Sequence, residues 1–388
     1  GRDKVSLVLM DPATCEELEQ LFSHEKYDVE GISYSRKRGK LLAAFCSGHK
    51  DPVRHYFDSD EEALRKRIKA HFPDHKVGLA DTDKAEQNLL LYVGNDRTRG
   101  AYYFYNVDED QPRLLAELAP WIREEEMVEM HAVTYTTRDG WEIEAYLSLP
   151  HGLTLETAHH VPTIINPHGG PWARDKWGFS SETQFLCSRG YAVFQMNFRG
   201  STGYGRKFLE ASYKQWGQAM QDDITDGVEW LIRQGISDPK RIAIYGGSYG
   251  GYATLAGVTY TPHLYACAVD YVGVSNLLTF MQTIPPYWRP MLEMMYEQVG
   301  DPEKDREMLE AYSPALHADK IVAPLFIAQG ANDPRVNKAE SDQMVAALRE
   351  RGVDVEYMVK DNEGHGFHNQ ENRFDFYRAM EAFLAKHL

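Results

Sequence analysis

The stretch Arg241-Ile242-Ala243-Ile244-Tyr245-Gly246-Gly247-Ser248-Tyr249-Gly250-Gly251 decides the fold. Its first five residues form an apolar run of strand length, and the glycines that follow indicate a tight turn. A helix is expected to begin at Tyr249. Gly-x-Ser-x-Gly between a strand and a helix presents a serine hydroxyl at the carboxyl edge of a sheet, so Ser248 is a candidate nucleophile.

Apolar strands and amphipathic helices alternate through the rest of the second half of the chain. The expected strands are Thr163–Asn166, Ala192–Asn197, Arg241–Tyr245, Cys267–Tyr271, Leu325–Gln329 and Val355–Val359. The expected helices are Met220–Gln234, Tyr249–Thr259, Lys338–Arg351 and Asn372–His387. This alternation predicts a mostly parallel sheet covered by helices on both faces. Upstream, Val133–Thr137 and Trp141–Leu149 flank Arg138-Asp139-Gly140, which indicates a hairpin.

Two further side chains are candidates to activate the serine. A serine hydroxyl is a weak nucleophile until a positioned base takes its proton, and a Gly-x-Ser-x-Gly serine is followed in the chain by an acid and then a histidine. Among the downstream histidines, only His365 follows a strand within a glycine-rich loop, and Asp333 follows the preceding strand. Because parallel strands end at one sheet edge, Ser248, Asp333 and His365 are predicted to meet there.

The backbone can supply two donors to an oxyanion. The N–H of Tyr249 follows the nucleophile, and the second donor is expected in Pro167-His168-Gly169-Gly170-Pro171 after the first long parallel strand. Gly170 is favoured because Pro171 has no N–H. The alternative of His168 as a metal ligand lacks a second ligand at zinc spacing, and Gly200–Gly205 does not match a dinucleotide fingerprint. We therefore expect no metal and no cofactor.

The motifs together resemble those of the prolyl oligopeptidase family of serine peptidases, with the acylaminoacyl-peptidase-like subgroup most similar. They extend from near Met127 to the end of the chain and comprise Gly247–Tyr252, His168–Pro171, Asn197–Ser201, Asn332–Val336 and Glu363–Gly366. The resemblance implies a C-terminal α/β-hydrolase and an N-terminal β-propeller that selects substrates by size. It also implies that Arg335 binds the substrate carbonyl next to the scissile residue; the alternative is a surface salt bridge.

The first 120 residues are predicted to be mainly β. The expected strands are Val5–Met10, two within Gly31–Cys46, Val77–Ala80, Asn88–Val93, Ala101–Val107 and Arg113–Leu118, with a helix at Asp60–Phe72. Four short strands in about 42 residues match one propeller blade, so residues 1–120 are predicted to hold two blades and part of a third. Residues 121–388 are predicted to form the α/β-hydrolase domain.

A partial propeller has two consequences. Too few blades are present to close a ring, so we expect either a longer protein that begins upstream or self-association into a homo-oligomer. The alternative is that the β segment folds back onto the hydrolase as an open, twisted sheet. In both cases the active site should be more open than under a full propeller. The resemblance also places the S1 pocket near Val274 and the stretch Ile284–Trp288, with Tyr287 and Trp288 as candidate lining. Aromatic lining predicts an apolar P1 residue. The alternative is ordinary core or lid packing.

Composition excludes several classes of function. Among 388 residues, 42 are Lys or Arg and 58 are Asp or Glu, a net charge of −16 that argues against nucleic-acid and anionic-membrane partners. Four cysteines without a CxxC pair argue against a disulfide framework, which slightly favours the cytoplasm. No leader is recognisable at Gly1, and the start of the sequence is compatible with a native N-terminus further upstream. The sequence therefore predicts a serine peptidase acting on short peptides through an acyl-enzyme, with a carboxylesterase as the alternative.

Overall fold

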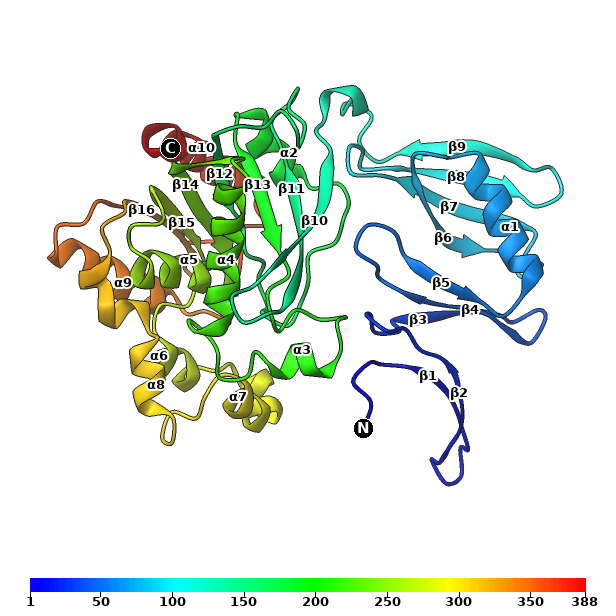
Figure 1. The fold of residues 1–388 in the computed structure, drawn as a ribbon, viewed down its shortest axis with the longest axis horizontal. Coiled ribbons are helices and arrows are strands. Elements are labelled where there is room, and N and C mark those ends of the chain that lie inside the picture. The colour runs from blue at the N-terminus through cyan, green and yellow to red at the C-terminus, as the bar shows by residue number, and fades with distance from the viewer.

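The computed structural model describes all 388 residues, and its larger part is built on one eight-stranded sheet (Figure 1). The strands lie in the order β10 (Met130–Thr136), β11 (Glu142–Ser148), β13 (Ala192–Met196), β12 (Val161–Ile165), β14 (Ser237–Gly247), β15 (Cys267–Tyr271), β16 (Leu325–Gly330) and β17 (Val355–Lys360). The predicted hairpin β10–β11 is antiparallel and joins the sheet through a second antiparallel pair, between β11 and β13. The remaining five strand pairs are parallel. The predicted α/β-hydrolase fold is confirmed.

Both faces of this sheet are covered because its central strand is apolar on both sides. Side chains alternate along β14, so Ile242 and Ile244 join one core cluster while Ala243 and Tyr245 join another. The long helices whose buried residues belong to the first cluster are α4 (Ala219–Arg233), α5 (Tyr249–Tyr260) and α9 (Lys338–Glu350). On the opposite face lie α2 (Ser181–Ser188) and α10 (Gln370–His387).

Short helices lie outside the regular alternation. Between β15 and β16 the chain forms α6 (Leu277–Gln282), the 3₁₀ turn η2 (Pro286–Met291), α7 (Leu292–Gln298), α8 (Arg306–Ala311) and η3 (Pro314–Lys320). Two other short elements are α3 (Arg206–Glu210) and η1 (Glu124–Glu126). Buried residues of the 277–320 stretch join the same core cluster as those of α4 and α5. No helix of the structure has the length and apolar character needed to cross a membrane.

The N-terminal region is a partial propeller of three small antiparallel sheets to one side of the hydrolase sheet (Figure 1). Their strands are β1 (Leu7–Met10) and β2 (Glu17–Phe22); β3 (Gly31–Ser35), β4 (Lys40–Cys46) and β5 (Val53–Tyr56); and β6 (Lys76–Thr82), β7 (Asn88–Gly94), β8 (Ala101–Asn106) and β9 (Gln111–Glu117). Helix α1 (Ser59–Ala70) contacts the four-stranded sheet, where Ile68 joins a small core with Leu91 and Tyr105.

Polar contacts join the partial propeller to the hydrolase. The carboxylate of Glu144 on β11 is buried, and it accepts hydrogen bonds from the hydroxyls of Tyr27 (2.6 Å) and Tyr204 (2.9 Å). Lys26 Nζ lies 2.8 Å from the same carboxylate. Since Lys26 and Tyr27 precede β3, this buried acid ties the first part of the chain to the hydrolase sheet.

Candidate active site

Ser248 occupies a strained turn between β14 and α5. Its backbone has φ 60° and ψ −118°, a left-handed conformation that a non-glycine residue adopts only where the surroundings enforce it. The neighbouring glycines make the turn sterically feasible. A Cβ on Gly246 would lie 2.5 Å from the Gly250 carbonyl, and one on Gly250 would lie 2.2 Å from the Pro167 carbonyl oxygen. The turn therefore requires glycine on both sides of the serine.

The three predicted catalytic side chains meet at the carboxyl edge of the sheet. Ser248 Oγ lies 3.0 Å from His365 Nε2, and His365 Nδ1 lies 2.7 Å from Asp333 Oδ2. With the proton on Nδ1 donated to Asp333, Nε2 is free to accept the serine hydroxyl hydrogen. This geometry allows the imidazole to act as a general base toward Ser248.

The Asp333 carboxylate is fully enclosed and fully bonded. Its Oδ1 accepts the backbone N–H groups of Arg335 (2.8 Å) and Val336 (2.9 Å), while Oδ2 also accepts from Gln329 Nε2 at 3.3 Å. The Asp333 side chain has no exposed surface, whereas the His365 side chain is 15% exposed. The acid is thus held in place, and the base is partly exposed to solvent.

Two backbone N–H groups flank the serine. Tyr249 is the first residue of α5, so its N–H belongs to the helix end that has no intrahelical acceptor. Gly170 is exposed, has φ 130°, and its N–H has no hydrogen-bond partner in the structure. A Cβ on the adjacent Gly169 would lie 3.5 Å from Ser248 Cβ, so this loop contacts the nucleophile. Tyr249 is thus adjacent to Ser248 in the chain, and the loop that carries Gly170 contacts the serine through Gly169, while the oxyanion role of both N–H groups stays a prediction.

Comparisons with known proteins agree with this geometry. Residues 177–388 match the model of the prolyl oligopeptidase family. The chain belongs to this family. It is 43% identical over its full length to dipeptidyl aminopeptidase BIII of Pseudoxanthomonas mexicana, of which it covers 56%. Over 76% of the chain it is 39% identical to dipeptidyl peptidase family member 6 of Caenorhabditis elegans, of which it covers 43%.

The fold is also similar to that of solved structures. A puromycin-hydrolyzing peptidase of Mycobacterium tuberculosis superposes with a TM-score of 0.80 at 24% identity, covering 95% of this chain and 56% of that one. The chain thus spans about half the length of the relatives that it matches. The identification with the prolyl oligopeptidase family made from the motifs is confirmed.

Arg335 lies close to the acid of this prolyl oligopeptidase site. Its backbone N–H donates to Asp333, while its side chain is exposed and makes no hydrogen bond or ion pair. The guanidinium is therefore free to bind a ligand. The alternative of a surface salt bridge has no acid to support it in this structure.

The three candidate S1 residues are placed differently. Val274 is buried, and Trp288 packs against the core cluster that includes Val274. Tyr287 contacts Trp288 edge to face at 6.0 Å and is otherwise 55% exposed. No hydrogen bond or ring contact links Tyr287 or Trp288 to the residues around Ser248. Val274 and Trp288 thus belong to the same packed region, whereas Tyr287 contacts only Trp288 among the three candidates.

Two tryptophans beside the nucleophile helix were missed by the sequence analysis. The Trp216 ring meets the Tyr249 ring edge to face at 4.6 Å, and Trp172 lies 6.5 Å from Trp216. Both indole N–H groups are buried without a hydrogen-bond partner. The available signal was the position of Trp172 directly after Pro171. No comparable signal existed for Trp216, because it is distant from Tyr249 in the sequence and contacts that ring only once the chain is folded.

His168 connects the loop that carries Gly170 to Phe198 and Ser201. Its Nδ1 lies 2.8 Å from the Gly169 carbonyl oxygen and its Nε2 lies 2.8 Å from Ser201 Oγ, while its ring stacks on Phe198 at 4.3 Å. Burial lowers the pKa of His168 to about 4. The neutral ring therefore donates to Gly169 and accepts from Ser201, a structural role rather than the metal-binding one.

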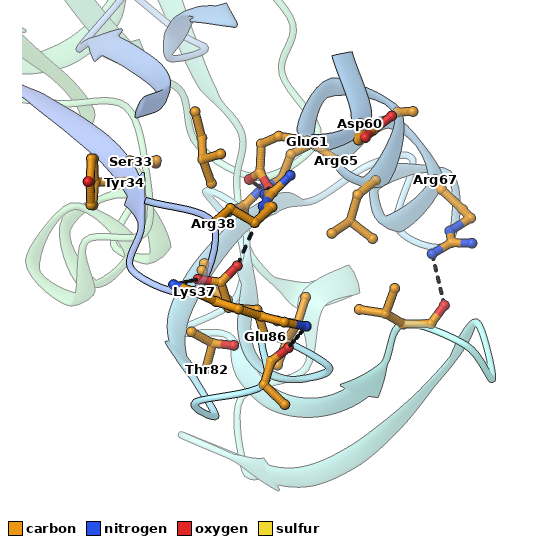
Figure 2. A pocket seen from close by; sticks show the side chains of 17 residues that line it. Ser33, Tyr34, Lys37, Arg38, Asp60, Glu61, Arg65, Arg67, Thr82 and Glu86 are labelled. Carbon is orange, nitrogen blue, oxygen red and sulfur yellow. Dashed lines mark hydrogen bonds and ion pairs between the residues drawn. The ribbon is translucent and has the colours of Figure 1, made fainter. Parts of the chain in front are cut away.

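A separate cavity of about 530 Å³ lies in the partial propeller between β3–β4, α1 and β6–β7 (Figure 2). Its cationic side chains already have partners. Arg38 binds Asp58, Arg65 binds Glu61, and the remaining two bind carbonyl oxygens, Lys37 that of Ala85 and Arg67 that of Val107. Each cationic side chain of this cavity therefore already has a hydrogen-bond or ion-pair partner. No group of three or more His, Cys, Asp or Glu side chains is arranged to hold a metal ion.

The His168 pKa predicts an acid-sensitive loop. A histidine in the unfolded chain has a pKa of about 6.5, so between pH 6.5 and 4 the unfolded chain binds a proton that the folded chain does not. The stabilisation present above pH 6.5 is lost as the pH falls toward 4. Urea unfolding midpoints should therefore fall more steeply over this range in the wild type than in His168→Gln. The exposed His151→Gln variant should keep the wild-type slope, and equal slopes for wild type and His168→Gln would contradict the assignment.

Proposed function

We propose that this protein is a serine peptidase that hydrolyses short peptides through an acyl-enzyme. The observation that carries the proposal is the continuous hydrogen-bonded line from Ser248 Oγ through His365 to the enclosed carboxylate of Asp333. Membership of the prolyl oligopeptidase family supports it, and so do the names of the relatives, which are peptidases.

In the proposed first half-reaction, Ser248 Oγ bonds to the scissile carbonyl carbon while His365 Nε2 takes the hydroxyl proton. The resulting oxyanion accepts the N–H groups of Tyr249 and Gly170, each worth about 3–4 kcal/mol in systems of this type. The C–N bond then breaks, and Nε2 gives the proton to the leaving amine. Asp333 holds the Nδ1 proton throughout and stabilises the imidazolium.

The second half-reaction releases the acyl group with the same residues. Water replaces the amine, His365 takes one of its protons, and the hydroxide oxygen bonds to the acyl carbon. The ester bond to Ser248 Oγ then breaks, and Nε2 returns the proton to that oxygen. No external oxidant, metal or cofactor is needed for the balance of atoms.

The substrates that we propose are peptides with a free N-terminus, from which a dipeptide is released. This choice rests on the two relatives named as dipeptidyl peptidases. The triad geometry alone is equally compatible with small esters, so a carboxylesterase is the alternative. Initial rates on a dipeptidyl anilide, its N-acetylated form and a simple acyl ester separate these possibilities. Faster cleavage of the free dipeptidyl anilide supports the proposal, and cleavage of the ester alone supports the alternative.

We further propose that the chain divides into two domains, residues 1–120 and 121–388. In support of this division, no sheet contains strands from both parts. Every proposed catalytic group then belongs to the second domain, and the first domain supplies no residue to the proposed catalytic site.

The proposed nucleophile gives the most direct test. Ser248→Ala should lower kcat on the order of 10⁶-fold, because the remaining oxyanion donors and substrate binding supply only the residual catalysis. The rate of anilide release measures this loss. Ser188→Ala, an exposed serine on α2, should retain wild-type kcat. Unchanged turnover in Ser248→Ala would refute the assignment.

Arg335 is proposed to bind the substrate carbonyl next to the scissile residue. Replacing it by Gln should raise KM about tenfold or more with a smaller change in kcat, since a hydrogen bond from a charged group contributes about 1.5–3 kcal/mol. Arg351 is likewise exposed without an ion pair, so Arg351→Gln is the matched control and should behave as wild type. An unchanged KM in Arg335→Gln would remove this residue from the site.

Val274, Tyr287 and Trp288 are proposed to line S1. Trp288→Ala should lower kcat/KM for a substrate with an aromatic P1 residue by about tenfold relative to one with alanine, because apolar pocket contacts contribute about 1–3 kcal/mol. Thermal unfolding should change less than this preference. Trp121→Ala, which alters a 76% exposed ring, is the control. Lower stability with an unaltered P1 preference would instead indicate ordinary packing.

A further inference from the structure

Tyr271, at the end of β15, is bonded to both loops that carry the proposed nucleophile and base. Its carbonyl oxygen accepts the backbone N–H of Ser248 at 2.9 Å. Its hydroxyl accepts the backbone N–H of Phe367, two residues after His365. One side chain and its own backbone therefore connect the turn of Ser248 with the loop of His365.

The Tyr271 ring is fixed between these loops by packing. It stacks on Phe376 of α10 at 4.6 Å and meets Phe367 edge to face at 5.2 Å. A glycine of each loop lies beside it at ordinary van der Waals distance. A Cβ on Gly247 would lie 3.4 Å from the ring, and one on Gly366 would lie 3.5 Å from the hydroxyl. The hydroxyl therefore has little freedom to leave its place below the histidine loop.

The histidine loop has a second attachment on its other side. The buried carboxylate of Glu363 accepts the backbone N–H groups of His368 (2.9 Å) and Asn369 (2.8 Å). It also accepts the amide of Asn372 at 2.7 Å. These bonds fix the loop relative to the start of α10, but they do not connect it to the nucleophile turn. Besides the His365–Ser248 hydrogen bond itself, the bond from Phe367 N–H to the Tyr271 hydroxyl connects this loop to a residue that is bonded to the nucleophile turn.

We propose that Tyr271 is a positioning residue that sets the distance between Ser248 Oγ and His365 Nε2 through its hydroxyl. The inference rests on the proposed serine peptidase activity and adds a residue to it. Tyr271 does not touch the reacting atoms in this scheme. Its effect arises because proton transfer from the serine depends on close approach of Nε2, and a displacement of about 1 Å can cost about 10²-fold in rate.

The test compares Tyr271→Phe with Tyr377→Phe. The first variant removes the hydroxyl and keeps the ring, so the stacking on Phe376 is preserved. The Tyr377 ring contacts the same Phe376, and its hydroxyl donates to Glu182 at 2.9 Å, away from both loops. Anilide kinetics are measured below the thermal unfolding transition of each variant, together with the rate of labelling by a fluorophosphonate probe.

We expect Tyr271→Phe to lower kcat and the labelling rate about tenfold with KM within about twofold of wild type, a smaller loss than that from a full 1 Å displacement. Tyr377→Phe should match wild type in all three quantities. Wild-type kcat and labelling in Tyr271→Phe, a changed KM with constant kcat, or an equal loss in both variants would each overturn the inference. Activity that persists in Ser248→Ala would instead overturn the proposed function, so the two failures are distinguishable.

Discussion

The enclosed carboxylate of Asp333 is the constraint on which the site depends. A charge removed from water is tolerated only if its lone pairs are occupied, and here two backbone N–H groups, one amide and one imidazole occupy them. The backbone donors follow directly from the turn after β16. The imidazole has to come from another loop, so satisfying the acid also orients His365. Ser248 then meets an imidazole whose free nitrogen already points toward it.

Much of this arrangement was predictable from the sequence because it depends on local patterns and one topological rule. The strand–turn–helix context identifies Ser248, and the apolar runs before Asp333 and His365 show that each follows a strand. Parallel strands bring such loops to the same edge, which is why three residues up to 117 positions apart could be predicted to meet. Gly170 was distinguishable from Pro171 by the presence of an N–H group.

Other features depend on contacts that the sequence does not encode locally. Strand β2 is exposed at its first four positions, including Leu18, and pairs with β1 alone, so it shows no alternation of buried and exposed residues. The short helices between β15 and β16 lack the length that makes an amphipathic period visible. Trp216 and Tyr271 reach the site by packing and by single hydrogen bonds from distant elements. Such side chains become recognisable only after the sheet order and the loops are known.

Three glycines at the ends of β14 and β16 and in the first turn of α5 restrict where the sequence of this scaffold can change. Gly246, Gly250 and Gly330 each face a backbone carbonyl oxygen of another segment at 2.1–2.5 Å from where a Cβ would lie. A mutation at any of them has to displace two main chains together, whereas a mutation in the helical stretch after β15 changes only side chains. Sequence change is therefore tolerated more easily in that stretch than at these glycines, where the main chains are crowded.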